Sequence, residues 1–117
     1  MTNTSNYTNL EYLRLMSDGD AEMEKTMLEM LLAELPQEFS KLKALHAAGE
    51  WEDLSSISHK MKSTLAFVGN EEMTAANKEI EQLAKHLTDL DRIASLIDIL
   101  ENNIWKAVSE LEQELQA

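Results

Sequence analysis

Residues 51–69 read WEDLSSISHKMKSTLAFVG, and this segment gives the clearest indication of the fold. It has the features of one amphipathic helix, because Glu52 and Asp53 stand in the first turn, where the helix dipole favours negative charge. Gly69 follows the last apolar residue and suits the left-handed conformation that ends many helices. Apolar residues recur at spacings of three and four, which predicts one buried face: Leu54, Ile57, Met61, Leu65 and Val68.

Helical segments flank this stretch on both sides. Before it, we expect a short helix from a capping box at Thr8–Glu11 to about Met16, then a long helix from about Asp20 to Ala48. Pro36 should kink or break the long helix, and Gly49 should cap its end. After the stretch, Asn70 should cap a helix, and a turn around residues 88–91 leads to the last helix. The three further apolar stripes are Met23, Met27, Leu31, Leu35, Phe39, Leu42 and Leu45; Met73, Ala76, Ile80, Leu83 and Leu87; and Ile93, Ile97, Leu100, Ile104, Val108, Leu111 and Leu115.

The composition supports a purely helical protein. Good helix formers dominate, and the chain holds only three glycines and one proline in 117 residues. Four long amphipathic helices with short connections favour an up-down-up-down four-helix bundle with a short additional N-terminal helix. The sequence therefore predicts one all-α domain over residues 1–117.

Charge and hydropathy exclude several classes of function. The formal net charge of −12 makes nucleic acid and anionic membranes poor partners, because both require clustered Lys and Arg. The longest apolar run is Met30–Ala33, too short to span a bilayer, and the first residues lack the pattern of a signal peptide. The absence of cysteine rules out disulfides, thiolate metal sites and cysteine catalysis. We therefore expect a cytoplasmic protein, which could be free-standing or a domain of a larger kinase.

The chain also lacks the motifs of common enzymes and cofactor sites. It has no glycine-rich phosphate loop, no G-x-S-x-G elbow, no H-E-x-x-H and no E-x-x-H. We therefore predict no metal, no cofactor and no ATP-dependent activity. Three histidines remain as candidates for chemistry, of which His46 and His86 fall near helix ends, where the dipole favours a partial positive charge. Both are expected to be surface residues.

His59 differs from the other two histidines. At about 100° per residue, it falls about 160° from the centre of the apolar stripe of its helix, so it should face the solvent. The residues around it on that face are mostly small, which leaves the imidazole open to a protein-sized partner: Ser55, Ser63 and Ala66. Lys62, one turn further on, offers a cation to an anion attached to the ring. A neutral imidazole is a competent nucleophile near physiological pH.

The segment HKMKSTLAFVG, residues 59–69, resembles the signature of histidine phosphotransfer (HPt) domains. In that family an apolar residue, a Lys, a small residue and a Gly follow the phosphoryl-accepting His, and here those places hold Met61, Lys62, Ser63 and Gly69. Ser63 departs from the usual glycine but is still small. On the next helix the family places a polar residue near the His, which corresponds to Glu81, or to Gln82 if that helix is slightly rotated.

The resemblance implies a phosphoryl carrier that is not a kinase. His59 would accept the group from the aspartyl phosphate of a receiver domain and pass it to a second receiver, with Lys62 stabilising its charge. The Mg²⁺ ion would belong to the receiver. Docking would use exposed apolar residues near His59, for which the candidates are Leu10, Leu13, Ala66 and Phe67.

Two alternatives to a monomeric carrier remain open. One is an interaction module of the same fold that binds a receiver domain or a kinase without carrying phosphate. The other is a helical adaptor that dimerises through an apolar face, for which the methionines offer a plastic surface. Most methionines fall on the predicted core stripes, which favours core packing over such a surface.

Overall fold

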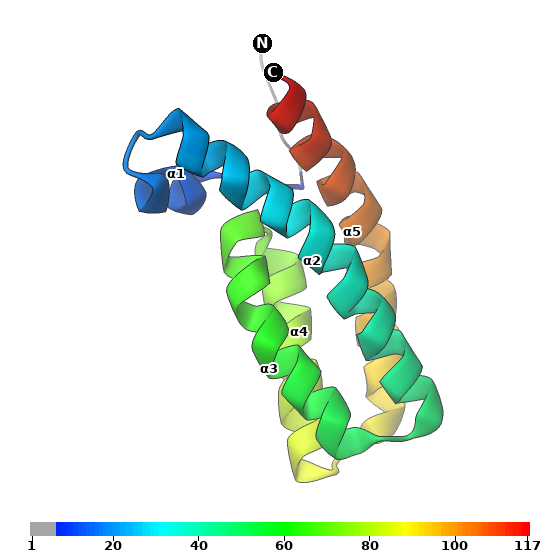
Figure 1. The fold of residues 1–117 in the computed structure, drawn as a ribbon. Coiled ribbons are helices and arrows are strands. Elements are labelled where there is room, and N and C mark those ends of the chain that lie inside the picture. The colour runs from blue at the N-terminus through cyan, green and yellow to red at the C-terminus, as the bar shows by residue number, and fades with distance from the viewer. Residues whose placement is uncertain (1–6) are drawn as a thin grey trace.

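The computed structural model describes residues 7–117, which form five α-helices and one short 3₁₀ helix. These are α1 (Glu11–Ser17), α2 (Ala21–Ala48), α3 (Trp51–Val68), α4 (Glu71–His86), η1 (Leu90–Arg92) and α5 (Ile93–Gln116). The long helices α2 to α5 alternate in direction, each packs against the next, and α5 packs back on α2 to close the bundle (Figure 1). The predicted all-α four-helix bundle with a short N-terminal helix is confirmed.

The core runs along the bundle axis and uses the predicted stripe of every long helix. Leu35 and Phe39 of α2, Met61 of α3, Ile80 of α4 and Ile104 of α5 are all fully buried. Burying one such side chain stabilises the fold by about 1.5–3 kcal/mol relative to leaving it in water. The stripe of α3 is buried from Leu54 to Val68, so the opposite face of that helix is presented to solvent.

The predicted helix ends are correct where a side chain or a glycine caps the backbone. The Asp20 carboxylate accepts hydrogen bonds from the N–H groups of Glu22 and Met23, at 2.9 and 3.1 Å, and so begins α2. The Asn70 side chain accepts from the N–H of Met73 at 3.0 Å and begins α4. Gly49 closes α2 in the left-handed conformation, at a φ of 69°.

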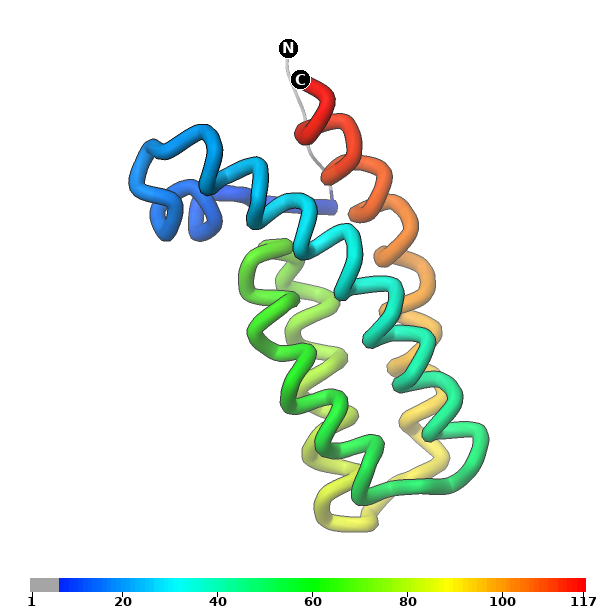
Figure 2. The backbone as a smooth tube through the Cα atoms, in the orientation of Figure 1, coloured from blue at the N-terminus to red at the C-terminus, as the bar shows by residue number. Residues whose placement is uncertain are grey.

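An N-terminal segment crosses the bundle next to the end of α3, before α1 begins (Figure 2). The Asn9 N–H donates to the carbonyl of Val68 at 2.9 Å, and the Asn70 amide donates to the carbonyl of Tyr7 at 3.2 Å. A Cβ atom on Gly69 would lie 2.1 Å from the Asn9 carbonyl oxygen. The close approach therefore requires glycine at position 69, in addition to its left-handed φ of 75°.

Two predictions about local structure are wrong, the second in part. The capping box does not form, because the Thr8 hydroxyl donates to Glu110 of α5 at 2.9 Å and α1 begins only at Glu11. Instead, the Asn9 side chain accepts from the Glu11 N–H at 3.0 Å. Of the kink or break expected at Pro36, the break does not occur, because α2 continues as one helix through this residue. Proline removes a single backbone hydrogen bond there, and the buried neighbours Leu35 and Phe39 hold the helix in place.

Several apolar side chains lie outside the core. Among them are methionines, a residue type that the sequence placed mostly on the buried stripes. Met23 and Leu87 were placed on buried stripes but are 49% and 62% exposed. Met16 and Met30 are also exposed, whereas Met61 and Met73 are fully buried. Met23 belongs to the first turn of α2, which begins beyond the level where α3 ends and α4 begins (Figure 1), and Leu87 follows the last turn of α4. Within residues 7–117, none of the helices has the length and apolar character needed to cross a membrane.

Candidate functional site

His59 lies on the outward face of α3, as its position in the helical repeat predicts. Its side chain is 68% exposed, while Ser58 beside it is fully buried. The residues one turn away on the same face, Ser55 and Ser63, carry short side chains, and neither covers the ring. The imidazole is therefore accessible to another protein.

The imidazole is held by a carboxylate of the neighbouring helix. Nδ1 of His59 lies 2.7 Å from Oε2 of Glu81 on α4, and the Glu81 side chain is only 12% exposed. A carboxylate accepts hydrogen bonds and donates none, so the proton of this bond belongs to Nδ1. Nε2 of the neutral ring consequently keeps its lone pair, and it has no partner among residues 7–117.

A buried polar contact fixes α3 against α4 directly beneath this pair. The Ser58 hydroxyl donates to the backbone oxygen of Asn77 or to its side-chain oxygen, which lie 2.8 and 2.7 Å away. The Asn77 amide donates back to the carbonyl of Ser58 at 2.9 Å. Asn77 lies one turn before Glu81 on α4, so the contact sets the relative position of His59 and Glu81. Sequence reasoning missed this contact, although two polar residues at positions facing a helix neighbour were a usable signal.

A hollow of about 500 Å³ opens beside His59 between α3 and α4. Its walls combine two hydroxyl groups, two carboxylates, one lysine and two apolar side chains with the imidazole. They are formed by Glu52, Ser55, Ser56, His59, Glu81, Ala84, Lys85 and Leu87. Lys85 was not predicted, although it follows Glu81 by one helical turn and therefore shares its face of α4. Among the described residues, no group of three His, Asp or Glu side chains could hold a metal ion.

The comparisons with known proteins agree with this geometry. A family model described as Hpt domain matches residues 26–117, most of the chain. The chain belongs to the Hpt domain family. Its role is therefore phosphotransfer in two-component signalling, in which Hpt domains act as phosphocarrier modules that interact with receiver domains.

A solved structure shares the fold of this Hpt domain. Histidine-containing phosphotransfer protein B (HptB) from Pseudomonas aeruginosa PAO1 superposes with a TM-score of 0.84 at 19% sequence identity, and the match covers 97% of each chain. At this identity the likeness concerns the fold alone. No curated protein sequence matches the chain.

The other residues singled out from the sequence are distributed along α3 and α4 of the Hpt domain. Lys62 is exposed and forms no ion pair with any described residue. Glu81 contacts His59, whereas Gln82 is exposed, so the rotation of α4 favours the first of the two alternatives. Gly69 ends α3 about 15 Å along the helix axis from His59, and its surroundings show a structural role.

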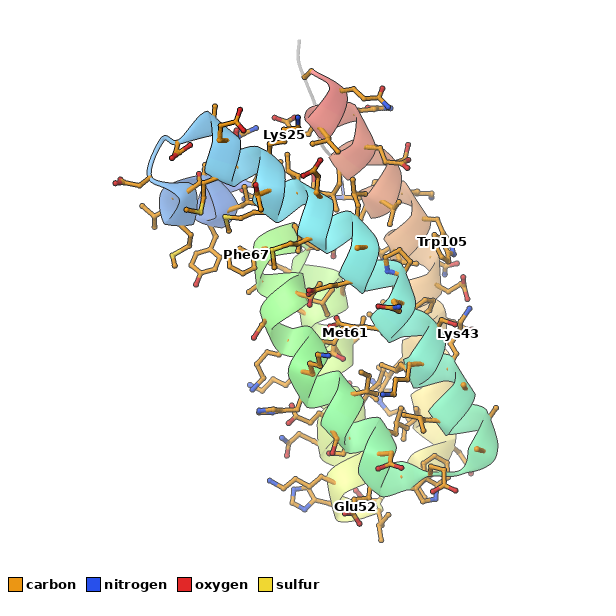
Figure 3. All side chains as sticks on the ribbon, in the orientation of Figure 1. Lys25, Lys43, Glu52, Met61, Phe67 and Trp105 are labelled. Atoms are coloured by element: carbon orange, nitrogen blue, oxygen red, sulfur yellow. The ribbon has the colours of Figure 1, made fainter. Side chains whose placement is uncertain are left out.

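An apolar hollow of about 230 Å³ lies further along α3, toward α1. Figure 3 shows Phe67 at the end of α3 next to α1, opposite the end that carries Glu52. The Phe67 ring stacks on Tyr12 of α1, with 5.1 Å between centroids and 27° between planes, and Ala66 beside it is exposed. The lining residues come from α2 and α3: Met27, Met30, Leu31, Glu34, Ser63, Thr64 and Phe67.

The candidates on the short first helix need correction. Leu10 and Leu13 are 7% and 0% exposed, because this face of α1 packs against α2 and α3, so neither can offer a docking surface. The outward apolar residues of α1 are Tyr12, Leu15 and Met16. A helix of seven residues is too short for its buried face to be predicted from periodicity.

Proposed function

We propose that this Hpt domain is a phosphorelay intermediate that carries a phosphoryl group on Nε2 of His59. One observation carries the proposal: an exposed imidazole whose Nδ1 is bonded to the carboxylate of Glu81 at 2.7 Å, which leaves Nε2 as the nucleophile. The phosphoryl group would come from the aspartyl phosphate of one receiver domain and pass to the aspartate of another.

The chemistry needs no proton transfer at the ring. The Nε2 lone pair attacks phosphorus, the bond from phosphorus to the aspartyl oxygen breaks, and its electron pair returns to the receiver as a carboxylate. The ring then carries a proton on Nδ1 and the phosphoryl group on Nε2, and its positive charge faces the Glu81 carboxylate at the distance of a short charge-assisted hydrogen bond. In the return step a receiver carboxylate attacks phosphorus, and the electron pair of the N–P bond returns to Nε2.

The charge of the transferred group would be stabilised by a lysine of α3. The transferred phosphoryl group spreads negative charge over its oxygens, so preorganised cations near the ring favour the transfer. We assign this role to Lys62, which is exposed one turn after His59 and has no other ionic partner in the described chain. Ser63 leaves room for the receiver. Gly69 lies about 15 Å from His59 along α3, so its contribution to the site is limited to its structural role at the end of that helix.

The receiver would dock over α3 beside the ring. Ala66 and Phe67 lie on this side, and the apolar hollow next to Phe67 adds the exposed Met30 of α2. Apolar side chains at the centre of an interface, surrounded by polar groups, are the usual arrangement of protein contacts. In this proposal the domain contributes the nucleophile, a cation and a docking surface.

The test is transfer of labelled phosphate from a panel of phosphorylated receiver domains to the wild-type chain, to His59→Gln and to His86→Gln. His86 is an exposed histidine near the end of the same helix that carries Glu81, so it is the matched control. We expect acid-labile, base-stable label on the wild type and on His86→Gln, and none on His59→Gln. Label that persists on His59→Gln, or that depends on His86, would refute the assignment.

A further inference from the structure

The left-handed residue that ends α4 is unusual among the long helices. α2 and α3 end at Gly49 and Gly69, with φ of 69° and 75°. α4 ends at Leu87, with a φ of 55°. Left-handed backbone brings a Cβ atom close to its own carbonyl oxygen, so glycine is the favoured residue there and a leucine is strained.

Leucine at position 87 gives the fold no added stability that would offset this strain. The cap consists of backbone hydrogen bonds, from the N–H groups of Leu87 and of Thr88 to the carbonyl of Leu83, and glycine at position 87 would make the same bonds. The Leu87 side chain is 62% exposed, so most of it does not contribute to the core. Strained residues of this kind gather at functional sites, where the side chain is needed for another purpose.

The exposed side chain lies at the site already described. Leu87 forms part of the wall of the hollow that also contains His59, Glu81 and Lys85. The hollow takes its α3 wall from residues 52–59, whereas the apolar hollow beside Phe67 takes its α3 wall from residues 63–67. The two hollows thus lie on either side of His59 along α3.

We propose that Leu87 is a docking residue for the receiver domain that exchanges its phosphoryl group with His59. The inference rests on the proposed function, because a receiver whose aspartyl phosphate reaches Nε2 must cover this hollow and with it the exposed part of Leu87. The partner surface next to the aspartate would present an apolar side chain. His59 would then lie between two apolar contacts, one at Phe67 and one at Leu87, and these would exclude water from the ring.

The experiment compares Leu87→Ala, Leu87→Gly and the control Asp89→Gly in the full chain. Asp89 has a φ of 45° in the same loop but does not line the hollow, so its replacement relieves similar strain away from the site. Both Leu87 variants should raise the KM for the phosphorylated receiver about tenfold, with kcat unchanged. This is the effect expected when the complex no longer buries a leucine side chain that is exposed in the free chain. Leu87→Gly should melt about 4 °C above Leu87→Ala, since only glycine relieves the strain. Asp89→Gly should leave KM unchanged.

Three results would overturn the proposal. An unchanged KM in Leu87→Ala would show that the receiver does not contact this side chain. A wild-type dimer in gel filtration that Leu87→Ala converts to a monomer would assign the residue to self-association. Failure of the wild-type chain to accept label from any receiver would overturn the proposed function and this inference together. If the wild type accepts label and Leu87→Ala has the same KM, this inference alone is overturned.

Discussion

Glu38 provides the sharpest test of the packing argument, because it is a carboxyl group buried between helices without a full set of partners. It lies on α2 and is 6% exposed, and its Oε1 has no hydrogen-bond partner among the described residues. Burial raises the pKa of the Glu38 carboxyl above its ordinary value of 4.5. A hydrogen bond from Thr64 opposes this rise in pKa, Glu34 adds to it, and Lys60 opposes it.

Replacing Glu38 with methionine should stabilise the fold. Methionine has a similar volume, and it removes a buried polar group whose unsatisfied state costs about 1–3 kcal/mol. For a domain of this size, that gain corresponds to a rise in Tm of about 4–12 °C at pH 7. The exposed Glu29 on the same helix is the matched control, and Glu29→Met should change the free energy of unfolding by less than about 0.5 kcal/mol.

The pH dependence separates this explanation from a general effect of the substitution. Because the folded state holds the Glu38 proton to a higher pH than the unfolded state does, this group makes the free energy of unfolding fall as pH rises from 4.5 through the raised pKa. Glu38→Met lacks this contribution, so its advantage over the wild type should be smallest near pH 4 and grow toward neutrality. Urea unfolding at a series of pH values measures the difference. A variant that is no more stable at pH 7, or an advantage independent of pH, would refute the reasoning.

Three further substitutions test the site and its support. Replacing Glu81 with alanine removes a charge-assisted hydrogen bond to His59, worth about 1.5–3 kcal/mol, and should slow phosphoryl acceptance about 10- to 100-fold in quenched-flow assays. An unchanged rate would show that the carboxylate does not prepare the ring. Gly69→Ala places a Cβ 2.1 Å from a backbone oxygen and should cost at least about 2 kcal/mol in urea unfolding. Gly49→Ala meets only ordinary contacts and should cost about 1 kcal/mol, so equal losses would contradict the structural role of position 69. Asn77→Ala leaves a buried hydroxyl without its side-chain partner and should destabilise the fold by about 2–3 kcal/mol, whereas a neutral effect would mean that the contact between α3 and α4 is dispensable.

The helices themselves could be predicted because their determinants are local. Asp20 and Asn70 cap helices through bonds to residues two or three positions away, and Gly49 supplies the left-handed end of α2. The capping box at Thr8 looked equally local, but the hydroxyl found a partner 102 residues away on α5. Local rules fail where a distant group offers a competing hydrogen bond.

The bundle and the outward direction of His59 follow from the order of residues alone, since a repeat of 3.6 residues fixes which face of a long helix is apolar. The choice between Glu81 and Gln82 needed the packed structure, because neighbouring residues differ by about 100° around α4 and their directions depend on how that helix rests against α3. The same holds for Leu87, which lines the same hollow as His59 because the end of α4 packs against the first half of α3. A helix carries its periodicity in its own residues, but its rotation against a neighbour is set by contacts that involve both.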